Sequence, residues 1–489
     1  MAGGGWARAR RGGARGREGA LALALAEAVG AANAQLLSSV FLGLQQAQGW
    51  APPALGGLAL AEGLASAVAG PAWQRSLGRW GGGGPARALG AGCVCWGLAT
   101  ALCAAAPSFA FFLLVRAMAA AALAAVPPAA SCFFPEGPAS EGRLPGRWEG
   151  RSPPGGDVFG EALSGSRSRR WLALGQVGGG LAGGVVAAVL ARGEESGPRD
   201  LWGGQGWRFA LLSVAGMCVP AALASAMFLP REVRARAGGL GALERKALLS
   251  CASPAFVVAS LQMGLDAVPR SALLFSTMWL QLRGLSDGEA SACSASLAVG
   301  HAVGSFAGRH LGDLAVAASP GRGRVALAQL LDALRVAAVW TVFRASPARP
   351  GLAGAEAALA FLLLGFLSAC MEMGVSQPLL ICSAPAQVGL AGFERALRGL
   401  WSALFGAPLV GYIAQSWLGY HAVPGMALRE MPAAAREKNA TALGTSICTV
   451  ACAAWAASFV AATPLYFFHR ESEASVVRHR RLAGASRFG

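Results

Sequence analysis

The chain has 489 residues, of which 54% are hydrophobic and only 13% are charged. Soluble domains are roughly 25% charged, so this composition excludes an ordinary soluble protein. Apolar runs of about 20 residues, the length that crosses the hydrocarbon core of a bilayer, recur along the chain and predict a polytopic membrane protein.

Twelve apolar runs are long enough to be transmembrane helices, and they lie at residues 19–42, 53–73, 87–106, 109–130, 171–191, 207–229, 254–279, 288–308, 325–343, 352–383, 399–418 and 443–468. The tenth run is long and polar at its end, so we expect a tilted or broken helix there. Glycines in "GQVGGGLAGG" predict close helix packing of the fifth run.

The runs divide the chain into two pseudo-symmetric halves of six helices each, which predicts an all-α polytopic membrane protein. A basic tail (residues 1–18) precedes the first half (19–230), which contains a Pro/Gly-rich insertion (131–170). A linker (231–253) leads to the second half (254–468), and a basic tail (469–489) follows.

Basic residues decide the orientation of the helices. The formal net charge is +16, which in a soluble protein would suggest a nucleic-acid partner. Arginines gather in the tails and in every second connection, so both termini are expected in the cytoplasm and nucleic acid is excluded as a partner. The sequon "NAT" at Asn439 falls on a predicted outside loop and is a candidate glycosylation site. Plasma, vacuolar and organellar membranes all fit this pattern.

Enzyme and cofactor signals are absent from the sequence. The 11 cysteines form no CxxC pair and the 5 histidines have no metal-ligand spacing, so we expect no metal and no cofactor. A phosphate-binding GxxxxGK[ST] motif is also absent, which argues against an ATP-driven pump within this chain. We expect a monomeric non-enzyme whose partners are the lipid bilayer and a small-molecule or lipid-like substrate.

Two loops at matching positions of the halves resemble each other. "GPAWQRSLGRW" (residues 70–80) is predicted to join the second and third helices, and "GRHLGDLAVAASPGRGR" (308–324) is predicted to join the eighth and ninth. Related loops in two halves are typical of an internally repeated transporter.

These loops make the chain resemble the major facilitator superfamily. The stretches "LQMGLDAVPRSALLFSTMWLQLRGLSD", "GWRFALLSVAG" and "SQPLLICSAPAQVGLAGFERALRGLW" resemble, more narrowly, a plant and algal branch related to spinster-like carriers. The sequence departs from the family pattern at Gln74, where an acid is usual, at Ala120, where a glycine is expected, and at Arg398, where the branch has glutamate.

Polar and ionisable residues inside the predicted helices are costly in a bilayer and are therefore candidates for substrate binding or proton transfer. They are Glu27, Asn33, Glu62 and Arg116 in the first half, and Gln262, Asp266, Arg270, His301, Asp332, Arg335, Glu372 and Gln377 in the second.

Arg116 is the first of these candidates, because the resemblance implies a basic residue of the fourth helix that faces the cavity. Its alternative role is to extend from a helix end toward water. Glu27 or Glu62 would be its partner and would carry a proton.

In the second half, Asp266 with Arg270 and Asp332 with Arg335 are spaced to form ion pairs on one helix face. His301 would couple protons or be a buried, hydrogen-bonded histidine.

The resemblance assigns a gating role to residues of the two loops, namely Gly70, Arg75, Gly78, Arg79, Arg309, Gly312, Asp313, Gly323 and Arg324. Asp313, paired with Arg309 or with a neighbouring helix end, would stabilise the outward-open state, and the alternative is that these charges only anchor the topology.

The sequence therefore predicts a secondary active carrier of a small organic solute that works by alternating access, with proton coupling as an option. Two alternatives stay open. One is a spinster-like carrier of lysolipid or sphingolipid-type amphiphiles. The other is a non-transporting receptor or scaffold, which the departures at Gln74 and Arg398 favour.

Overall fold

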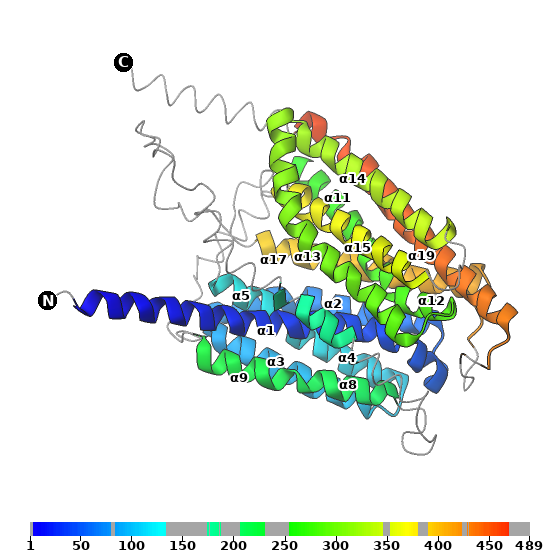
Figure 1. Cartoon of the computed structure of the whole chain (residues 1–489), viewed down its shortest axis with the longest axis horizontal. Coiled ribbons are helices and arrows are strands. Elements are labelled where there is room, and N and C mark those ends of the chain that lie inside the picture. The colour runs from blue at the N-terminus through cyan, green and yellow to red at the C-terminus, as the bar shows by residue number, and fades with distance from the viewer. Residues whose placement is uncertain are drawn as a thin grey trace.

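The computed structural model describes residues 3–79, 84–133, 174–175, 177–184, 186, 206–229, 254–345, 353–379, 390–422, 428 and 430–468. The regular elements of these residues are helices (Figure 1). The linker 231–253, the C-terminal tail and the insertion beyond Phe133 lie outside the described residues.

The first bundle comprises α1 (Gly3–Gln48), α2 (Pro52–Arg79), α3 (Gly84–Ala104), α4 (Phe109–Leu123), α5 (Val126–Phe133), α8 (Gly206–Gly216) and α9 (Cys218–Phe228). The predicted fifth helix is described in part, and its glycines lie against α1. An added methyl group on Gly175, Gly179 or Gly183 would overlap the α1 backbone. The prediction of close packing is therefore confirmed for this part of the helix.

The second bundle comprises α11 (Pro254–Ala272), η1 (Leu273–Phe275), α12 (Ser276–Leu282), α13 (Asp287–Ala318), α14 (Gly323–Trp340), η2 (Thr341–Ala345), α15 (Ala353–Met371), η3 (Glu372–Ser376), α17 (Leu390–Phe405), α18 (Ala407–Tyr412), η4 (Ile413–Trp417) and α19 (Ala433–Ala462). The start of α13 is fixed by a capping box, in which the Ser286 hydroxyl accepts from the Glu289 amide at 3.3 Å and the Glu289 carboxylate accepts from the Ser286 amide at 2.9 Å.

Within the described residues, nine helical segments are long and apolar enough to cross a membrane. They coincide with nine of the twelve predicted helices. Of the other three, the fifth is described only in part, and the seventh and eighth are the helical stretches α11–α12 and α13. These two stretches carry polar residues such as Gln262, Asp266 and His301, which lower their hydropathy. The chain is thus an integral, multi-pass membrane protein.

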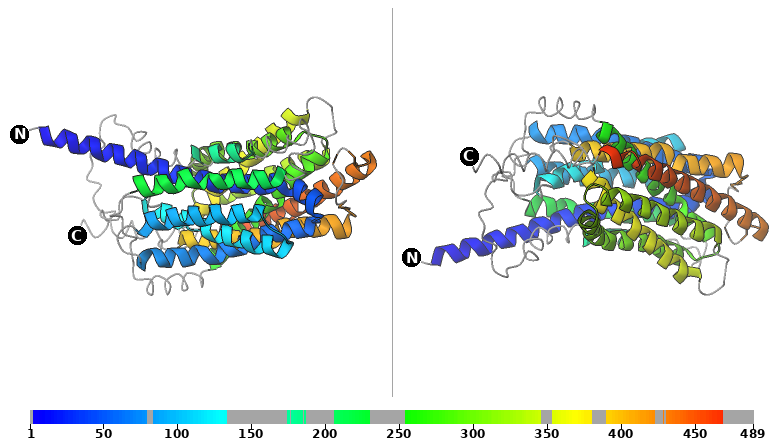
Figure 2. Two further views of the ribbon diagram at one scale, coloured as in Figure 1. Left: turned by 90° about the horizontal axis from the view of Figure 1, so that it is seen from below. Right: turned by 90° about the horizontal axis from the view of Figure 1, so that it is seen from above.

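Two bundles meet at one end and separate toward the other (Figure 1). Both views of Figure 2 show the helices running along the long axis of the molecule. We name the end where the bundles meet the closed end, and the opposite end, where α1 starts and α19 finishes, the open end. The last turns of α2 and α13 also lie at the open end.

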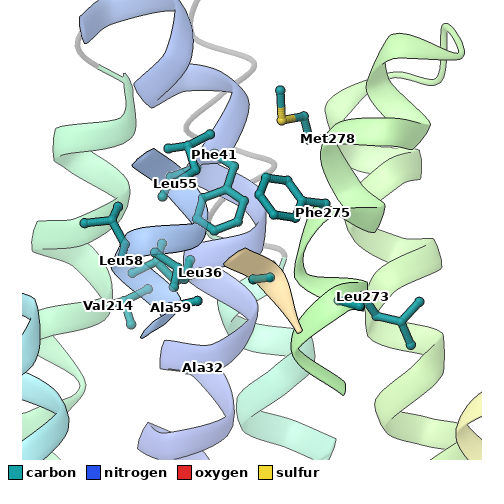
Figure 3. Packing of buried hydrophobic residues seen from close by; sticks show 14 of the residues in the cluster. Ala32, Leu36, Phe41, Leu55, Leu58, Ala59, Val214, Leu273, Phe275 and Met278 are labelled. Carbon is teal, nitrogen blue, oxygen red and sulfur yellow. The ribbon is translucent and has the colours of Figure 1, made fainter. Parts of the chain in front are cut away.

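Contacts between the bundles hold the closed end together. The rings of Phe41 on α1 and Phe275 on η1 point at one another with centroids 5.0 Å apart (Figure 3). Tyr420 donates to Gln45 at 2.9 Å, and Thr277 donates to Ser38 at 3.4 Å. These buried pairs join residues of opposite bundles, so this end admits no solute in the conformation described.

The two loops predicted at residues 70–80 and 308–324 are largely helical, which corrects the sequence prediction. The helix α2 continues through Pro71 to Arg79, and α13 continues to Ala318. Charged residues end the apolar run but not the helix, because arginine, leucine and alanine all favour helix in water. A tight turn follows α13, where Gly321 has a φ of 79° that suits glycine.

The tenth predicted helix runs as one helical segment from Gly354 to Leu379 and is interrupted by a π-helical turn, where the sequence predicted a tilted or broken helix. The α-helical part ends at Met371, and a π-helical turn from Glu372 to Ser376 follows. Such turns insert a residue into the helix and often occur at functional sites. This turn places Glu372 among the charged residues described below.

Candidate functional site

A cavity of about 490 Å³ lies between the two bundles. The helices around it are α1, α2, α4 and α5 of the first bundle and α11 and α17 of the second. Most of its lining is alanine, glycine, leucine and proline. Its polar lining residues are Glu27, Asn33, Glu62, Ser66, Gln74, Arg270, Ser271 and Ser402. It extends along α2 as far as Gln74, toward the open end.

Arg116 is buried behind the cavity wall. Its side chain is 1% exposed and forms an ion pair with Glu62, which is 18% exposed and lines the cavity. Glu62, one of the two predicted acidic partners, is therefore in contact with Arg116. Arg116 itself is not among the described residues that line the cavity.

Asn33 and Glu27 line the cavity from α1. Asn33 is 9% exposed, and its Oδ1 atom has no hydrogen-bond partner among the described atoms. A buried amide oxygen without a partner costs about 1–3 kcal/mol of desolvation.

Arg335 on α14 joins two carboxylates inside the second bundle. It forms ion pairs with Asp332, as the spacing predicted, and with Asp266 on α11. Its guanidinium carbon also lies 4.9 Å from the centre of the Trp455 ring. The Ser458 hydroxyl donates to Asp332 at 3.0 Å and accepts from Gln262 at 3.3 Å, so Gln262 lies in this network and not on the cavity wall.

The predicted pair between Asp266 and Arg270 is wrong. Both residues lie on α11, but Asp266 points into the bundle and Arg270 is 67% exposed on the cavity side. Arg270 pairs instead with Glu372 at 3.1 Å. Asp266 is already paired with Arg335 inside the bundle, so Arg270 pairs with the carboxylate that another helix brings to the cavity side.

Glu372 is the centre of a second charged cluster. It forms ion pairs with Arg398 and Arg270, and its Oε2 atom lies 3.6 Å from Nε2 of His301. Arg398 also lies 3.7 Å from Asp266, which connects the two clusters. In the sequence Arg398 is only a departure from the family pattern, and no local signal indicates its contact with Glu372. Gln377 is not among the residues that line the cavity.

The gating candidates lie at the open end. Asp313 pairs with Arg324 on α14 at 3.5 Å, while Arg309 contacts Met373 with its Nη2 atom 3.7 Å from the sulfur. Both contacts are within the second bundle. Of the candidates in the first half, Gly70 lines the cavity, Arg75 is exposed, and Gly78 and Arg79 end α2. In the second half, Gly312 lies against the backbone of Gly374, and Gly323 lies against the backbone of Ala315.

Asn439 does not suit glycosylation in this conformation. Its side chain is 2% exposed within α19. The amide nitrogen donates to the His421 carbonyl at 2.8 Å, and the amide oxygen accepts from the His421 amide at 3.0 Å. The sequon predicted an accessible loop, but here the asparagine holds the chain that precedes α19.

Fold and cavity together define a class of protein, a polytopic helical membrane protein with two bundles around a central cavity. No protein-family model and no curated protein matches the sequence. Solved structures do resemble it.

A bacterial homolog of the human lysosomal transporter Spinster, crystallised in an inward-facing and unoccupied conformation, has a TM-score of 0.69 at 18% identity, covering 94% of this chain and 97% of that chain. The nucleoside transporter NupG has a TM-score of 0.59 at 12% identity, over 91% and 99% of the two chains. A D-xylose–proton symporter has a TM-score of 0.55 at 14% identity, over 90% and 96%. The chain thus has the major facilitator fold, as its loops predicted, while the narrower plant and algal branch stays a prediction.

Proposed function

We propose that this protein is a secondary active transporter that moves a small organic solute across a membrane by alternating access. The observation that carries the proposal is a cavity between two bundles that is sealed at one end. Alternating access requires this state and a second one in which the seal has moved to the other end.

The open end faces the cytoplasm in this proposal, so the described state is inward-open. Arg75, Arg309, Arg322 and Arg324 all lie at the open end, and arginines are enriched on the cytoplasmic side of membrane proteins. Both termini are then cytoplasmic.

Glu62 is the proposed proton carrier. It lies on the cavity wall and is partly exposed, and its charge is held by the buried Arg116. A proton taken from the cavity would neutralise Glu62 and release Arg116 from the ion pair, which changes the charge of the wall that a solute meets.

The alternative of a non-transporting receptor is weakened by Arg398. An arginine in place of the usual glutamate would argue against transport if its positive charge had no acidic partner. The contacts of Arg398 with Glu372 and Asp266 provide two carboxylates for it, so this argument for a receptor loses its basis.

Two measurements on the purified protein test the proposal. A thermal-shift screen with sugars, nucleosides, amino acids, organic anions and lysolipids identifies ligands, since a ligand at 100 times its Kd adds about 2.7 kcal/mol to the folded state. Each ligand found is then tested by counterflow in proteoliposomes. Uptake of labelled solute against preloaded unlabelled solute supports a carrier, whereas binding without exchange supports a receptor.

Variants of Glu62 test the proton step in the same vesicles. Glu62→Gln should exchange solute at a rate that no longer depends on an imposed pH gradient. Glu356→Gln, an exposed glutamate at the start of α15, is the matched control and should behave as the unmodified protein.

A further inference from the structure

The cavity wall is divided by charge between the two bundles. The first bundle contributes the carboxylates Glu27 and Glu62 and the amide of Asn33, and the second contributes the guanidinium of Arg270. A single solute between the bundles therefore meets acceptors on one side and a cation on the other.

Arg270 is well placed to bind an anionic group. Its side chain is 67% exposed while it lines the cavity, and its described ion pair uses the Nη2 atom alone. The carboxylate in that pair, Glu372, is shared with Arg398 and lies near His301. Arg270 thus shares its described acidic partner, Glu372, with Arg398. Its planar guanidinium can bind a further carboxylate by donating two parallel hydrogen bonds.

Asn33 and Glu62 provide the acceptors on the opposite wall. The Oδ1 atom of Asn33 is buried and has no described partner, so it represents an unmet hydrogen-bonding requirement at the cavity. Glu62 on α2 also lines the cavity from the first bundle, is 18% exposed and carries a charge. An ammonium group has three donors and no acceptor, which matches this pair of acceptors.

These groups lie at comparable depth in the membrane. At 1.5 Å per residue, Asn33 and Glu62 are about 22 and 15 Å from Gln48 and Pro52, the closed-end residues of α1 and α2. Arg270 is about 18 Å from Leu282, the closed-end residue of the helical stretch formed by α11, η1 and α12. The hydrocarbon core is about 30 Å thick, so all three lie near its middle. All three line the same cavity, so a molecule inside it meets residues of both bundles.

Most of the remaining lining is apolar and includes Leu37, Leu123, Leu274 and Pro127, while Ser66, Gln74, Ser271 and Ser402 supply its other polar groups. A volume of about 490 Å³ is in the range of pockets that bind small molecules. The site thus combines two opposite charged walls with a predominantly apolar surface between them.

We propose that the solute is a small zwitterion with an apolar body, whose carboxylate binds Arg270 and whose ammonium group binds Asn33 and Glu62. The inference rests on the proposed function, because it names the class of substrate for the same cavity. A zwitterion satisfies both walls and brings no net charge into the middle of the membrane.

A series of capped compounds tests this assignment by isothermal titration with the full-length protein in detergent. The probes are L-phenylalanine and L-leucyl-L-phenylalanine, each with its C-terminal amide, its N-acetyl form and its doubly capped form. The uncapped zwitterion should bind at least about tenfold more tightly than either singly capped form, since each cap removes a charge-assisted hydrogen bond. Equal affinity for capped and uncapped forms of both compounds overturns the proposal.

Variants assign each end of the zwitterion to a wall. In Arg270→Gln the zwitterion should bind only as tightly as its C-terminal amide, and the affinity for the amide should not change. In Arg270→Lys the zwitterion should still bind more tightly than the amide, by a smaller factor than in the unmodified protein. Asn33→Leu should weaken binding of the zwitterion and of the amide, because both carry the ammonium group. Binding of the N-acetyl form, which lacks that group, should not change. Arg322→Gln, an exposed arginine at the start of α14, is the matched control and should bind as the unmodified protein.

The outcome separates the two proposals. If the zwitterions do not bind but a nucleoside, a sugar or a lysolipid undergoes counterflow, the substrate class is wrong and the transporter stands. If the zwitterions bind with the predicted pattern but do not exchange, the site is correct and the transport function is wrong. An equal loss of zwitterion and amide binding in a folded Arg270→Gln protein contradicts the role given to Arg270.

Discussion

Replacing Gly56 by valine should open the closed end. Gly56 on α2 faces α18, and a Cβ atom added to it would lie 2.7 Å from the Ala407 carbonyl oxygen and 2.9 Å from Pro408 Cα. Both contacts are with backbone atoms of the other bundle, which cannot rotate away as a side chain can. Gly57, the next residue, has open space, with no described atom within 4 Å of an added Cβ.

The size of the effect follows from the overlap. Inserting carbon atoms into a close-packed contact costs about 1–3 kcal/mol. The bundles have to separate at this end when the cavity opens there, so the cost falls on the described state and not on the opposite one. The ratio of the two states should therefore shift by about 5- to 150-fold toward opening at this end.

A cysteine placed at Ser38 reports the shift. Ser38 is 4% exposed and lies in the closed-end contact with Thr277. Its reaction with a membrane-impermeant maleimide should be slow in the Ser38→Cys protein and several-fold faster when Gly56→Val is added. The protein without the added cysteine gives the background rate.

Gly57→Val is the control for this experiment. Both changes place the same side chain in the same turn of α2, so any effect on helix propensity is shared. Equal labelling rates in the two valine variants would refute the argument that the contact of α2 with α18 holds this end closed.

Three further outcomes are expected. The hydroxyl oxygens of Ser38 and Thr277 are 3.4 Å apart, so a Ser38→Cys/Thr277→Cys protein should form a disulfide on oxidation. The disulfide should stop counterflow and a reducing agent should restore it, whereas continued exchange in the cross-linked protein would contradict alternating access. Arg335→Met should destabilise the protein by about 3–5 kcal/mol because two buried carboxylates lose their shared cation, and changing both carboxylates to asparagine as well should recover most of the loss in thermal unfolding. Gly304→Ala should lower the unfolding temperature because its methyl group would overlap the α15 backbone, whereas Gly354→Ala, with no described atom within 4 Å of its added Cβ, should not.

Local properties of the sequence determined where most helices lie and what class of protein this is. A bilayer requires about 20 apolar residues per crossing, so hydropathy alone located helices such as α4 and α14. The ion pair between Asp332 and Arg335 was equally local, because residues three apart share one helix face. The loops at residues 70–80 and 308–324 were predicted wrongly for a related reason, since an apolar run marks the extent of the membrane and not the end of a helix.

Only the tertiary structure decided which charges meet. Arg335 and Asp266 are 69 residues apart, and Arg270 and Glu372 are 102 apart. No spacing rule connects such residues, because their distance depends on how whole helices pack against one another. The same holds for Arg398, which is a departure from a pattern in the sequence and a partner of Glu372 in the fold.

The side on which the cavity opens was also beyond the sequence. In the proposed transporter one sequence encodes both states of the cycle, and their free energies differ by only a few kcal/mol. Contacts such as those of Gly56 with Ala407 and of Tyr420 with Gln45 hold the described state, and they join residues of opposite bundles that are far apart in the sequence.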